Sequence, residues 1–504
     1  MTAPADRVFL DGEVHTLGTP DKTYEAVAVR DGRVVRLADT YEVEFLVGAE
    51  TEVIDLDGRV LLPGFVDAHV HMTTVGQHAV HADLRGAESL DDALARLRER
   101  ARHADEWILG YGFDESTWPD GRILTSDDLD GVSTDRPVVA FREDLHTAAV
   151  NSVVLDEYGN EMPDADVREN GVIVEDAVNV VTERVEPNRT EARELLREAQ
   201  REAHSRGITA VHDMVRKSRA PAAYRALDAA GDLRLRVRLN YWADHLDAVR
   251  ELGLATNWGS ENLRVGAIKS FTDGSLGGHT AKLSFDYADA DGERGTWVVD
   301  PEELDEIVQE ADRQGLQVTA HAIGDEAVDA VLDAYEATEN PGKSRHRIEH
   351  AELASDDAIE RMADLGVVAS MQPNFLKWSH PGGLYDDRIG AERRDTHNRY
   401  PAYLDAGVPL AFGSDSMPLD PLLGVHEATH PPEETQELSV TEALRAYTSG
   451  AAYAGFDEDR MGTIEEGYLA DFVALDRSPW DVDDIEHVPV AFTVVDGDIV
   501  YDAR

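Results

Sequence analysis

The sequence predicts an α/β protein whose main domain is a (β/α)8 TIM barrel. A small composite β-sandwich built from both termini and an inserted α/β subdomain are expected beside it. Three observations lead to this expectation. Eight apolar segments with strand character each precede a helical segment, and short strands with Asp-Gly turns occur at both ends. Residues able to bind a metal stand at the ends of five of the eight apolar segments, where barrel enzymes carry their chemistry.

The two ends of the chain, residues 1–60 and 459–504, are expected to form the sandwich. Asp31-Gly32 between two apolar runs is typical of a hairpin turn. Residues 61–458 are expected to form the barrel domain. Within it, residues 75–205 do not follow the strand–helix alternation. They are therefore expected to be largely an inserted subdomain that acts as a lid between barrel strands one and two.

The barrel strands are expected as apolar runs, because parallel barrel strands are buried on both faces. The first begins at Leu61, and the others span 207–213, 233–242, 263–271, 316–321, 346–350, 367–372 and 408–415. The helical segments span 220–230, 245–252, 302–314, 325–336, 356–365, 400–406 and 440–452. Several of these helices are followed by glycine, such as Gly231, which is a common stop signal.

The first barrel strand ends in His69 and His71. Alternate side chains of a strand share a face, so Asp67, His69 and His71 are expected to point the same way. Two imidazoles at the end of a buried strand are costly unless something binds them, and a metal ion is the simplest candidate. Alone, His-x-His is a weak signal, since both rings could be ordinary hydrogen-bonded strand residues.

Four later strands carry the same kind of residue at the same end: Lys269, His321, His350 and Asp415. Each alone has a structural explanation, such as a core histidine, a helix N-cap or a snorkelling lysine. Five strands with such residues in one structural position indicate a metal centre. Lys269 is one of only six lysines and lies inside an apolar strand. Carbon dioxide would convert its amine to a carbamate, an anion able to bridge two metals about 3.5–4 Å apart.

Composition limits the partners and the compartment. The 504 residues hold 47 Lys+Arg against 101 Asp+Glu, a formal net charge of -54, which argues against a nucleic-acid or anionic-membrane partner. The acidic excess is spread along the chain, and it is typical of a halophilic protein in a salt-rich cytoplasm. The alternative is an acidic mesophilic protein. Cysteine is absent, so disulfides and thiolate ligands are excluded. No signal core or membrane-length apolar run is present, so a cytoplasmic protein is expected.

Several segments resemble the amidohydrolase superfamily. They are Pro63-Gly-Phe-Val-Asp-Ala-His-Val-His71, the strand-four Lys269, His321, His350 and Gly413-Ser-Asp415. Further segments are similar to the third amidohydrolase family, the group of N-substituted formamide deformylases: Gly110-Tyr-Gly-Phe-Asp114, Trp118-Pro119, Asp273-Gly-Ser-Leu-Gly277, Arg347-Ile-Glu-His350 and Gly462-Thr-Ile-Glu-Glu-Gly467. The resemblance covers essentially the whole chain. It implies a barrel with a composite sandwich, a divalent metal centre with zinc as the usual metal, and hydrolysis of a C–N bond.

The resulting hypothesis assigns roles to the strand-end residues. His69, His71 and Asp415 hold one metal, His321 and His350 hold a second, and carboxylated Lys269 (N6-carboxylysine) bridges them. The predicted catalytic residues are Asp415, Lys269 and His350, with Asp415 as general base and then acid. Asp67 and Asp273 are expected to support the ligands, although Asp67 could equally bind backbone groups. The expected substrate-binding residues are Tyr111, Phe113, Trp118, Arg142, His146, His279 and Gln372.

The expected function is hydrolysis of an amide, N-acyl or N-formyl bond of a small molecule by a metal-activated hydroxide. Other readings remain open. A deaminase, a lactamase or an esterase could use the same site, because fold alone does not decide among them. The centre could hold one metal ion instead of two. A non-catalytic small-molecule binding or regulatory protein is also compatible with the pattern. A homodimer is the base-rate expectation for the assembly.

Overall fold

The computed structural model describes residues 3–104, 106–119, 121–143, 146–168, 170–216 and 218–504. The chain divides into two compact units. Residues 1–72 and 200–504 form the first, and residues 73–199 form the second. Among the described residues, no helix has both the length and the apolar character needed to cross a membrane. The two units are described in turn.

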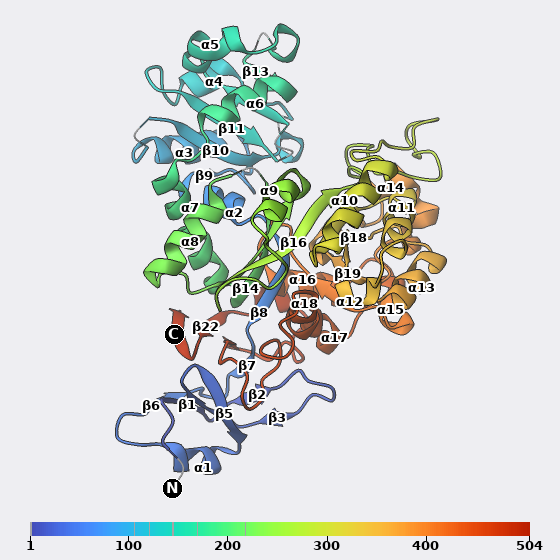
Figure 1. Ribbon diagram of the computed structural model, residues 1–504. Coiled ribbons are helices and arrows are strands. Elements are labelled where there is room, and N and C mark those ends of the chain that lie inside the picture. The colour runs from blue at the N-terminus through green and yellow to red at the C-terminus, as the bar shows by residue number, and fades with distance from the viewer. Residues whose placement is uncertain (1–2, 105, 120, 144–145, 169, 217) are drawn as a thin grey trace. The chain divides into compact units, whose positions relative to one another are not determined.

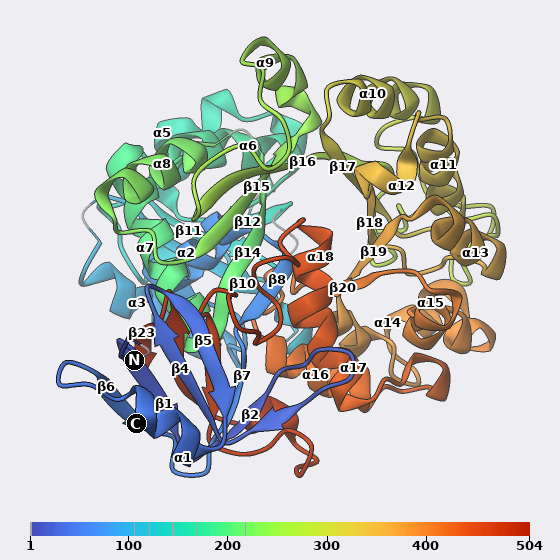
Figure 2. The same cartoon turned by 60° about the horizontal axis from the view of Figure 1, so that its bottom comes forward.

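The first unit contains an eight-stranded parallel sheet that curls into a barrel, which confirms the predicted fold class (Figures 1 and 2). Its strands, in chain order and in spatial order, are β8 (Phe65–Val70), β14 (Ile208–Val215), β15 (Arg236–Trp242), β16 (Leu263–Phe271), β17 (Gln317–Ala322), β18 (Arg347–His350), β19 (Val368–Met371) and β20 (Leu410–Phe412). All neighbouring pairs are parallel. Nearly every residue in these strands is buried, as the apolar runs predict.

The barrel closes between its first and last strands at the predicted metal ligands. The Asp415 N–H donates to the His69 carbonyl at 2.7 Å, and the Ser414 N–H donates to Asp67 Oδ1 at 3.0 Å. Gly413 permits this approach, because a Cβ at that position would lie 2.4 Å from the His69 nitrogen. The seam therefore fixes the backbone of both ligand segments.

The expected first strand is wrong in one respect: residues 61–71 form two strands in two different sheets. β7 (Val60–Pro63) pairs with sandwich strands, and β8 pairs with barrel strand β14. The chain changes sheets at Gly64, whose N–H donates to the Asp471 carbonyl at 2.9 Å. A Cβ at Gly64 would lie 2.3 Å from a Thr209 side-chain atom, so the crossing needs glycine.

Helices cover the outer side of the barrel, and Figure 2 shows α10, α11, α13 and α15 outside strands β17 to β20. The barrel helices are α8 (Ala220–Ala230), α9 (Leu246–Glu251), α10 (Pro301–Arg313), α11 (Asp325–Glu336), α13 (Asp356–Leu365), α15 (Tyr400–Ala406), α17 (Val440–Arg445) and α18 (Ala451–Ala454). Helices α12 (Pro341–Ser344), α14 (Leu384–Ile389) and α16 (Pro421–Thr429) were not expected from the sequence. They lie in connections whose apolar residues lack a long helical period.

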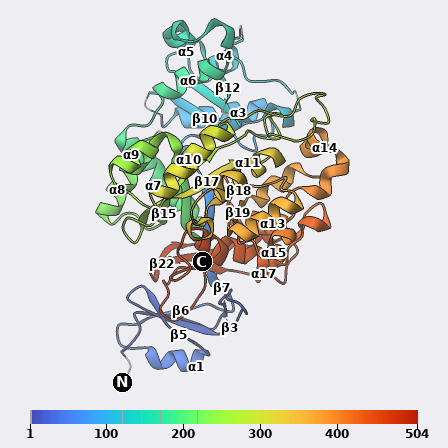
Figure 3. The ribbon, with the colours of Figure 1, turned by 45° about the vertical axis from the view of Figure 1, so that its right-hand side comes forward.

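The sandwich lies at one end of the first unit, near the N terminus (Figures 1 and 3). One sheet has the order β5 (Arg33–Ala38), β4 (Ala26–Arg30), β1 (Arg7–Leu10) and β6 (Glu52–Asp55). The other has the order β23 (Asp498–Asp502), β22 (Val490–Val495), β21 (Phe472–Leu475), β7, β2 (Glu13–His15) and β3 (Thr23–Tyr24). Strands from both termini thus share one sheet. Phe9, Phe472 and Phe492 pack together between the sheets.

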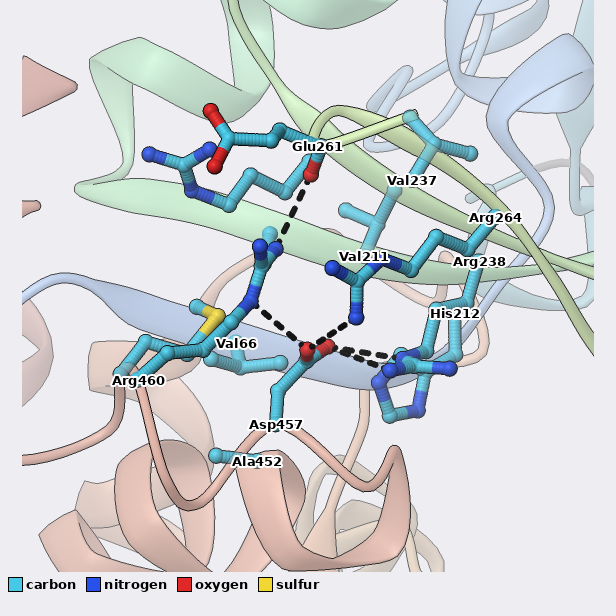
Figure 4. Close-up of a pocket in the computed structure, with 13 residues that line it drawn as sticks. Val66, Val211, His212, Val237, Arg238, Glu261, Arg264, Ala452, Asp457 and Arg460 are labelled. Carbon is cyan, nitrogen blue, oxygen red and sulfur yellow. Dashed lines mark hydrogen bonds and ion pairs between the residues drawn. The ribbon is translucent and has the colours of Figure 1, made fainter. Parts of the chain in front are cut away.

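The N-terminal end of the barrel is held by buried charges (Figure 4). Asp457 accepts hydrogen bonds from Arg238 of β15 at 2.8 Å, Arg264 of β16 at 3.1 Å and Arg460 at 2.8 Å. Arg238 and Asp457 are both buried. One carboxylate therefore ties two adjacent strands to the segment that follows α18. This end is the one opposite to the predicted metal ligands.

The second unit contains a five-stranded mixed sheet. Its order is β13 (Val172–Val174), β12 (Thr147–Val150), β11 (Val138–Arg142), β10 (Ile108–Phe113) and β9 (Ala82–Asp83). Its helices are α2 (Met72–Val80), α3 (Leu90–Ala101), α4 (Ser126–Asp130), α5 (Ser152–Tyr158), α6 (Glu175–Arg184) and most of α7 (Arg189–Ser205). This unit has hydrophobic clusters of its own on the two sides of the sheet. Its role as a lid stays a prediction.

Candidate metal centre

The four predicted histidine ligands lie side by side at the C-terminal end of the barrel strands. His69 comes from β8 and His71 directly follows that strand, His321 comes from β17, and His350 is the last residue of β18. Ring centroids are 5.7 Å apart for His69 and His71, 5.2 Å for His69 and His350, and 4.4 Å for His321 and His350. Asp415, which follows β20, places Oδ1 3.1 Å from His71 Nε2 and 3.5 Å from His69 Nε2.

The backbone is unusual where two of these ligands leave their strands. His350 has φ 72° and Asp415 has φ 51°, and the residue after each, Ala351 and Ser416, also has positive φ. Non-glycine residues rarely adopt this left-handed region, and such strain is concentrated at functional sites. The two turns aim the His350 and Asp415 side chains at the same point as the β8 histidines.

The arrangement fits a divalent metal ion. Candidate ligand atoms of His69, His350 and Asp415 all lie within 4.8 Å of one another. Lys269 Nζ, His321 Nδ1 and His350 Nδ1 are buried without a hydrogen-bond partner in the described part of the chain. Buried polar atoms normally find a partner, because leaving them unpaired costs about 1–3 kcal/mol each. Imidazole and carboxylate are ligands that zinc and related metals prefer.

In three of the histidine rings, one nitrogen lies within hydrogen-bond distance of a protein oxygen, and the other nitrogen faces the candidate metal site. His69 Nδ1 lies 2.6 Å from Glu349 Oε2, His71 Nδ1 lies 3.2 Å from the Met214 carbonyl, and His321 Nε2 lies 2.9 Å from the Gly274 carbonyl. A ring nitrogen that donates to an oxygen leaves the other nitrogen of the neutral ring as a lone-pair donor to a metal. The three rings are therefore held in ligand-ready orientations.

The charges of the centre follow from burial and from its own neighbours. Burial alone would raise the pKa of Asp415, but His69, His71 and Lys269 outweigh it and lower that pKa to about 2. Burial lowers the pKa of the Lys269 amine to about 8. Burial, aided by Lys269, lowers the pKa of His321 to about 3. At neutral pH the centre thus offers an ionised carboxylate, a neutral His321 ring and a lysine that loses its proton readily.

Glu349, which the sequence analysis did not single out, is a central supporting residue. Its carboxylate contacts His69 and accepts hydrogen bonds from Thr319 Oγ1 and from Arg347 Nε at 2.9 Å. Burial opposes its ionisation, but Arg347 and His69 hold the pKa of Glu349 well below its usual range.

Arg347 extends this buried network. It also donates to Ser370 Oγ at 2.9 Å, to the Ala68 carbonyl at 2.6 Å and to His212 Nδ1 at 2.9 Å. All of these side chains are buried. The sequence signal for this network is Arg347-Ile-Glu349 inside a barrel strand. Residues two apart in a strand share a face, so both charges are expected on the same face of the barrel.

The chain is similar to known proteins over almost its full length. Residues 52–501 match the model of the amidohydrolase family, Amidohydro_3. The chain belongs to the amidohydrolase family. It is 33% identical to the YtcJ protein of Bacillus subtilis, with 98% of this chain and 99% of YtcJ covered. It is 26% identical to the N-substituted formamide deformylase of Arthrobacter pascens, with 100% and 99% covered.

A solved structure agrees with this family assignment. The crystal structure of an uncharacterized metal-dependent hydrolase from Pyrococcus furiosus matches 94% of this chain and 100% of its own, at 31% identity and a TM-score of 0.82. The predicted resemblance to the amidohydrolases is therefore confirmed, and membership of this family supports assignment of the chain as a hydrolase.

The two predicted supporting aspartates bind backbone groups in this amidohydrolase. Asp67 accepts from the N–H groups of His69 at 3.1 Å and Ser414 at 3.0 Å, so it orders the seam of the barrel instead of orienting an imidazole. Asp273 accepts from the N–H groups of Lys282, Ile323 and Gly324. Asp273 also lies 3.5 Å from His321 Nε2.

Two of the predicted substrate-binding residues lie in the first unit. Gln372 is buried after β19, with Nε2 3.5 Å from His69 Nδ1 and its Oε1 without a partner among the described residues. His279 lies in the long loop after β16, where Nε2 is 2.8 Å from Asp289 and the ring packs edge-on against Tyr287. Gln372 is thus at the centre, whereas His279 is engaged within its loop.

The other five lie in the second unit. Phe113 and Trp118 are buried in a hydrophobic cluster of that unit and contribute to its packing. Trp118 Nε1 also donates to the Ala87 carbonyl at 2.8 Å. Tyr111 is buried and stacks on Phe141 at 4.8 Å. Arg142 pairs with Glu115 at 2.9 Å, and His146 is exposed, 3.3 Å from Glu175. Substrate contact by all five residues stays a prediction.

Proposed function

We propose that the protein is a metal-dependent hydrolase that cleaves a C–N bond of a small molecule, in an amide, N-acyl or N-formyl group. The observation that carries the proposal is the convergence of four imidazoles, Asp415 and a buried lysine that has no hydrogen-bond partner among the described residues. Zinc is the proposed metal, because histidine and carboxylate ligands suit it. The similar Arthrobacter protein is an N-substituted formamide deformylase, which supports a C–N bond as the target.

The proposed ligands are His69, His71 and Asp415 for one ion and His321 and His350 for a second. A divalent ion held there would supply an acidified water and an electrophile for the scissile carbonyl. Lys269 is the proposed bridging ligand, as a carbamate. Its amine has a pKa of about 8, so about a tenth of it is neutral and reactive toward carbon dioxide at pH 7.

Asp415 is the proposed proton carrier. With a pKa of about 2 its carboxylate is ionised at neutral pH, so it can accept a proton from the attacking water. It would then deliver that proton to the leaving nitrogen, which would otherwise depart as an unstable amide anion. Asp415 Oδ1 lies 3.1 Å from His71 Nε2, so the carboxylate and the free nitrogen of His71 would face the same ion.

The metal content per chain tests this proposal first. Elemental analysis of protein purified and kept at high salt is expected to show about two ions per chain. Lys269→Ala is expected to lose most of this metal, whereas Lys343→Ala, which changes an exposed lysine, is expected to keep it. One ion that persists in Lys269→Ala would exclude the bridge. Absence of metal after reconstitution would favour a binding protein.

A substrate panel tests the bond type. N-formyl and N-acyl amines would be compared with matched esters, lactams and cyclic amidines at saturating metal. We expect hydrolysis of the amides and about a 10²–10⁴-fold lower kcat for Asp415→Asn with metal content unchanged. Turnover of esters or amidines alone would contradict the C–N amide assignment.

A further inference from the structure

A row of stacked rings follows the C-terminal edge of the barrel and leads to the candidate metal centre. Trp242 is the last residue of β15, and Phe271 is the last residue of β16. Their ring centroids are 5.7 Å apart, with 16° between the planes. Phe271 stacks in turn on His321 at 3.8 Å and 14°. Trp242 and Phe271 are only half-buried although their faces stack on neighbours, so the row presents apolar ring edges beside the centre.

A cation lies at the far end of this row. Arg216 directly follows β14, and its guanidinium carbon is 4.4 Å from the centre of the Trp242 ring. The side chain is exposed, and none of the described carboxylates forms an ion pair with it. The chain has 101 acidic residues against 47 basic ones, so most arginines have a carboxylate within reach. Arg216 lies at the C-terminal end of the barrel strands and contacts only an aromatic ring among the described residues, which calls for an explanation.

The strand register gives the position of Arg216 relative to the centre. Val215 pairs with Tyr241, and Trp242 pairs with Lys269, so Arg216 follows in register beside Trp242. Adjacent strands lie about 4.8 Å apart, so the Arg216 backbone is about 10 Å from that of Lys269 across two strands. The two stacked rings therefore lie between this positive charge and the proposed reacting centre.

We propose that Arg216, Trp242 and Phe271 form a substrate subsite for a carboxylate joined through a flat apolar group to the bond that is cleaved. This proposal rests on the proposed function, because the subsite selects among substrates of that hydrolytic centre. A guanidinium stacked on a ring keeps its N–H groups free and oriented for bidentate binding of a carboxylate. The apolar group would lie edge-to-face against the exposed edges of Trp242 and Phe271.

The substrate class is therefore an N-acylated or N-formylated compound that bears an anionic group on the far side of an aromatic or similarly flat segment. Hydrolysis consumes one water and breaks the C–N bond to give an acid and an amine. The carboxylate held by Arg216 takes no part in this step and is unchanged in the product. Arg216 is a specificity-determining residue in this scheme and is not a catalytic one.

Binding of a non-hydrolysable probe tests the subsite on the metal-loaded full-length protein. The probe is 4-phenylbutyrate, and its neutral counterpart is 4-phenylbutanol, which has the same ring and chain. Isothermal titration calorimetry is expected to show tighter binding of the carboxylate. Arg216→Gln is expected to weaken carboxylate binding about tenfold and to leave the alcohol unchanged, because one charge-assisted contact is lost. Trp242→Leu is expected to weaken both probes.

Arg225→Gln is the matched control, since it removes the same charge from an exposed arginine on helix α8 of the same strand–helix unit. Equal losses in Arg216→Gln and Arg225→Gln would show a general charge effect and overturn the proposal. An unchanged affinity in Arg216→Gln would overturn it too, and would indicate that the probe binds the metal directly.

The probe has no bond to hydrolyse, so this result is separate from the test of the proposed function. Arg216-dependent binding without turnover of any amide would leave the subsite and remove the hydrolase assignment. Amide turnover together with probe binding that does not depend on Arg216 would keep the hydrolase assignment and remove the subsite. For a carboxylate-bearing amide and its neutral analogue, Arg216→Gln is expected to raise KM for the first alone, with kcat unchanged.

Discussion

Single residues that contact the candidate ligands set the geometry of this centre. Glu349 binds His69 Nδ1 at 2.6 Å and is itself held by Thr319 and Arg347. The charge of Glu349 raises the basicity of the His69 ring and fixes its tautomer. The network is fully buried, so it is protected from screening by salt. This is relevant for a protein whose surface charges are so numerous.

We expect Glu349→Gln to lower metal affinity about 10–100-fold while the protein stays folded. Glutamine keeps the size of the side chain but removes the charge that His69 faces. Competition with a chromophoric chelator would measure the affinity, and circular dichroism would report the fold. Glu360→Gln, on the exposed face of α13, is the control and should match the wild type. Unchanged competition in Glu349→Gln would show that the contact does not support the metal.

The sequence indicates the candidate ligands more clearly than the residues that support them. His69, Lys269, His321 and Asp415 stand out because polar residues at the ends of apolar strands have few structural explanations. Glu349 was overlooked because its function depends on a partner 280 residues away in the chain. The sequence does not show whether Phe113 and Trp118 belong to a core or to a pocket, because aromatic residues occur in both. Tertiary packing places both in a hydrophobic cluster.

At the level of elements, strand–helix alternation identified all eight barrel strands, because each needs a continuous apolar run. It did not separate β7 from β8, because both are apolar and only the Gly64 crossing divides them. It also missed α14 and α16, which lie in the loops at the C-terminal end. Loops follow local contacts instead of a repeating period, so they are the least predictable part.

The buried carboxylate at the N-terminal end of the barrel gives a test of stability. Asp457 faces Arg238, Arg264 and Arg460, so Asp457→Asn would leave three guanidiniums without their common partner. We expect a loss of about 3–5 kcal/mol in the free energy of unfolding, as for other broken buried pairs. Urea unfolding would measure it, with exposed Asp459→Asn as the control. A loss below that of the control would show that water replaces the carboxylate.

Helix α16 gives a test of pH dependence. Burial, together with Glu486 of the neighbouring turn, raises the pKa of Glu427 to about 7. A carboxyl group with a raised pKa in the folded state binds more protons there than when unfolded. Its contribution to stability is therefore present at low pH and is lost as pH rises from about 4 to 7.

Glu427→Gln should then raise the urea midpoint at pH 8 and leave it nearly unchanged at pH 4. Because the side chain is partly exposed, we expect a gain of only about 1 kcal/mol at pH 8. Exposed Glu434→Gln is the control. Equal midpoint changes at both pH values would indicate a packing effect and contradict the titration.

At the scale of the whole molecule, the formal charge of -54 opposes folding through self-repulsion. Salt should relieve it, because the Debye length falls from about 10 Å at 0.1 M to about 3 Å at 1 M. We therefore expect the thermal midpoint to rise by about 10 °C or more between 0.1 M and 2 M KCl, with most of the gain below 1 M.

The shape of the salt curve separates screening from exclusion of solute at the protein surface. Screening saturates once the Debye length falls below the spacing of surface charges, whereas exclusion grows steadily with concentration. Sucrose at matched osmolality is the control, since it is excluded but carries no charge. A rise that levels off in KCl and is absent in sucrose would support adaptation to a salt-rich cytoplasm. Equal linear gains in both solutes would instead indicate an acidic protein without special dependence on salt.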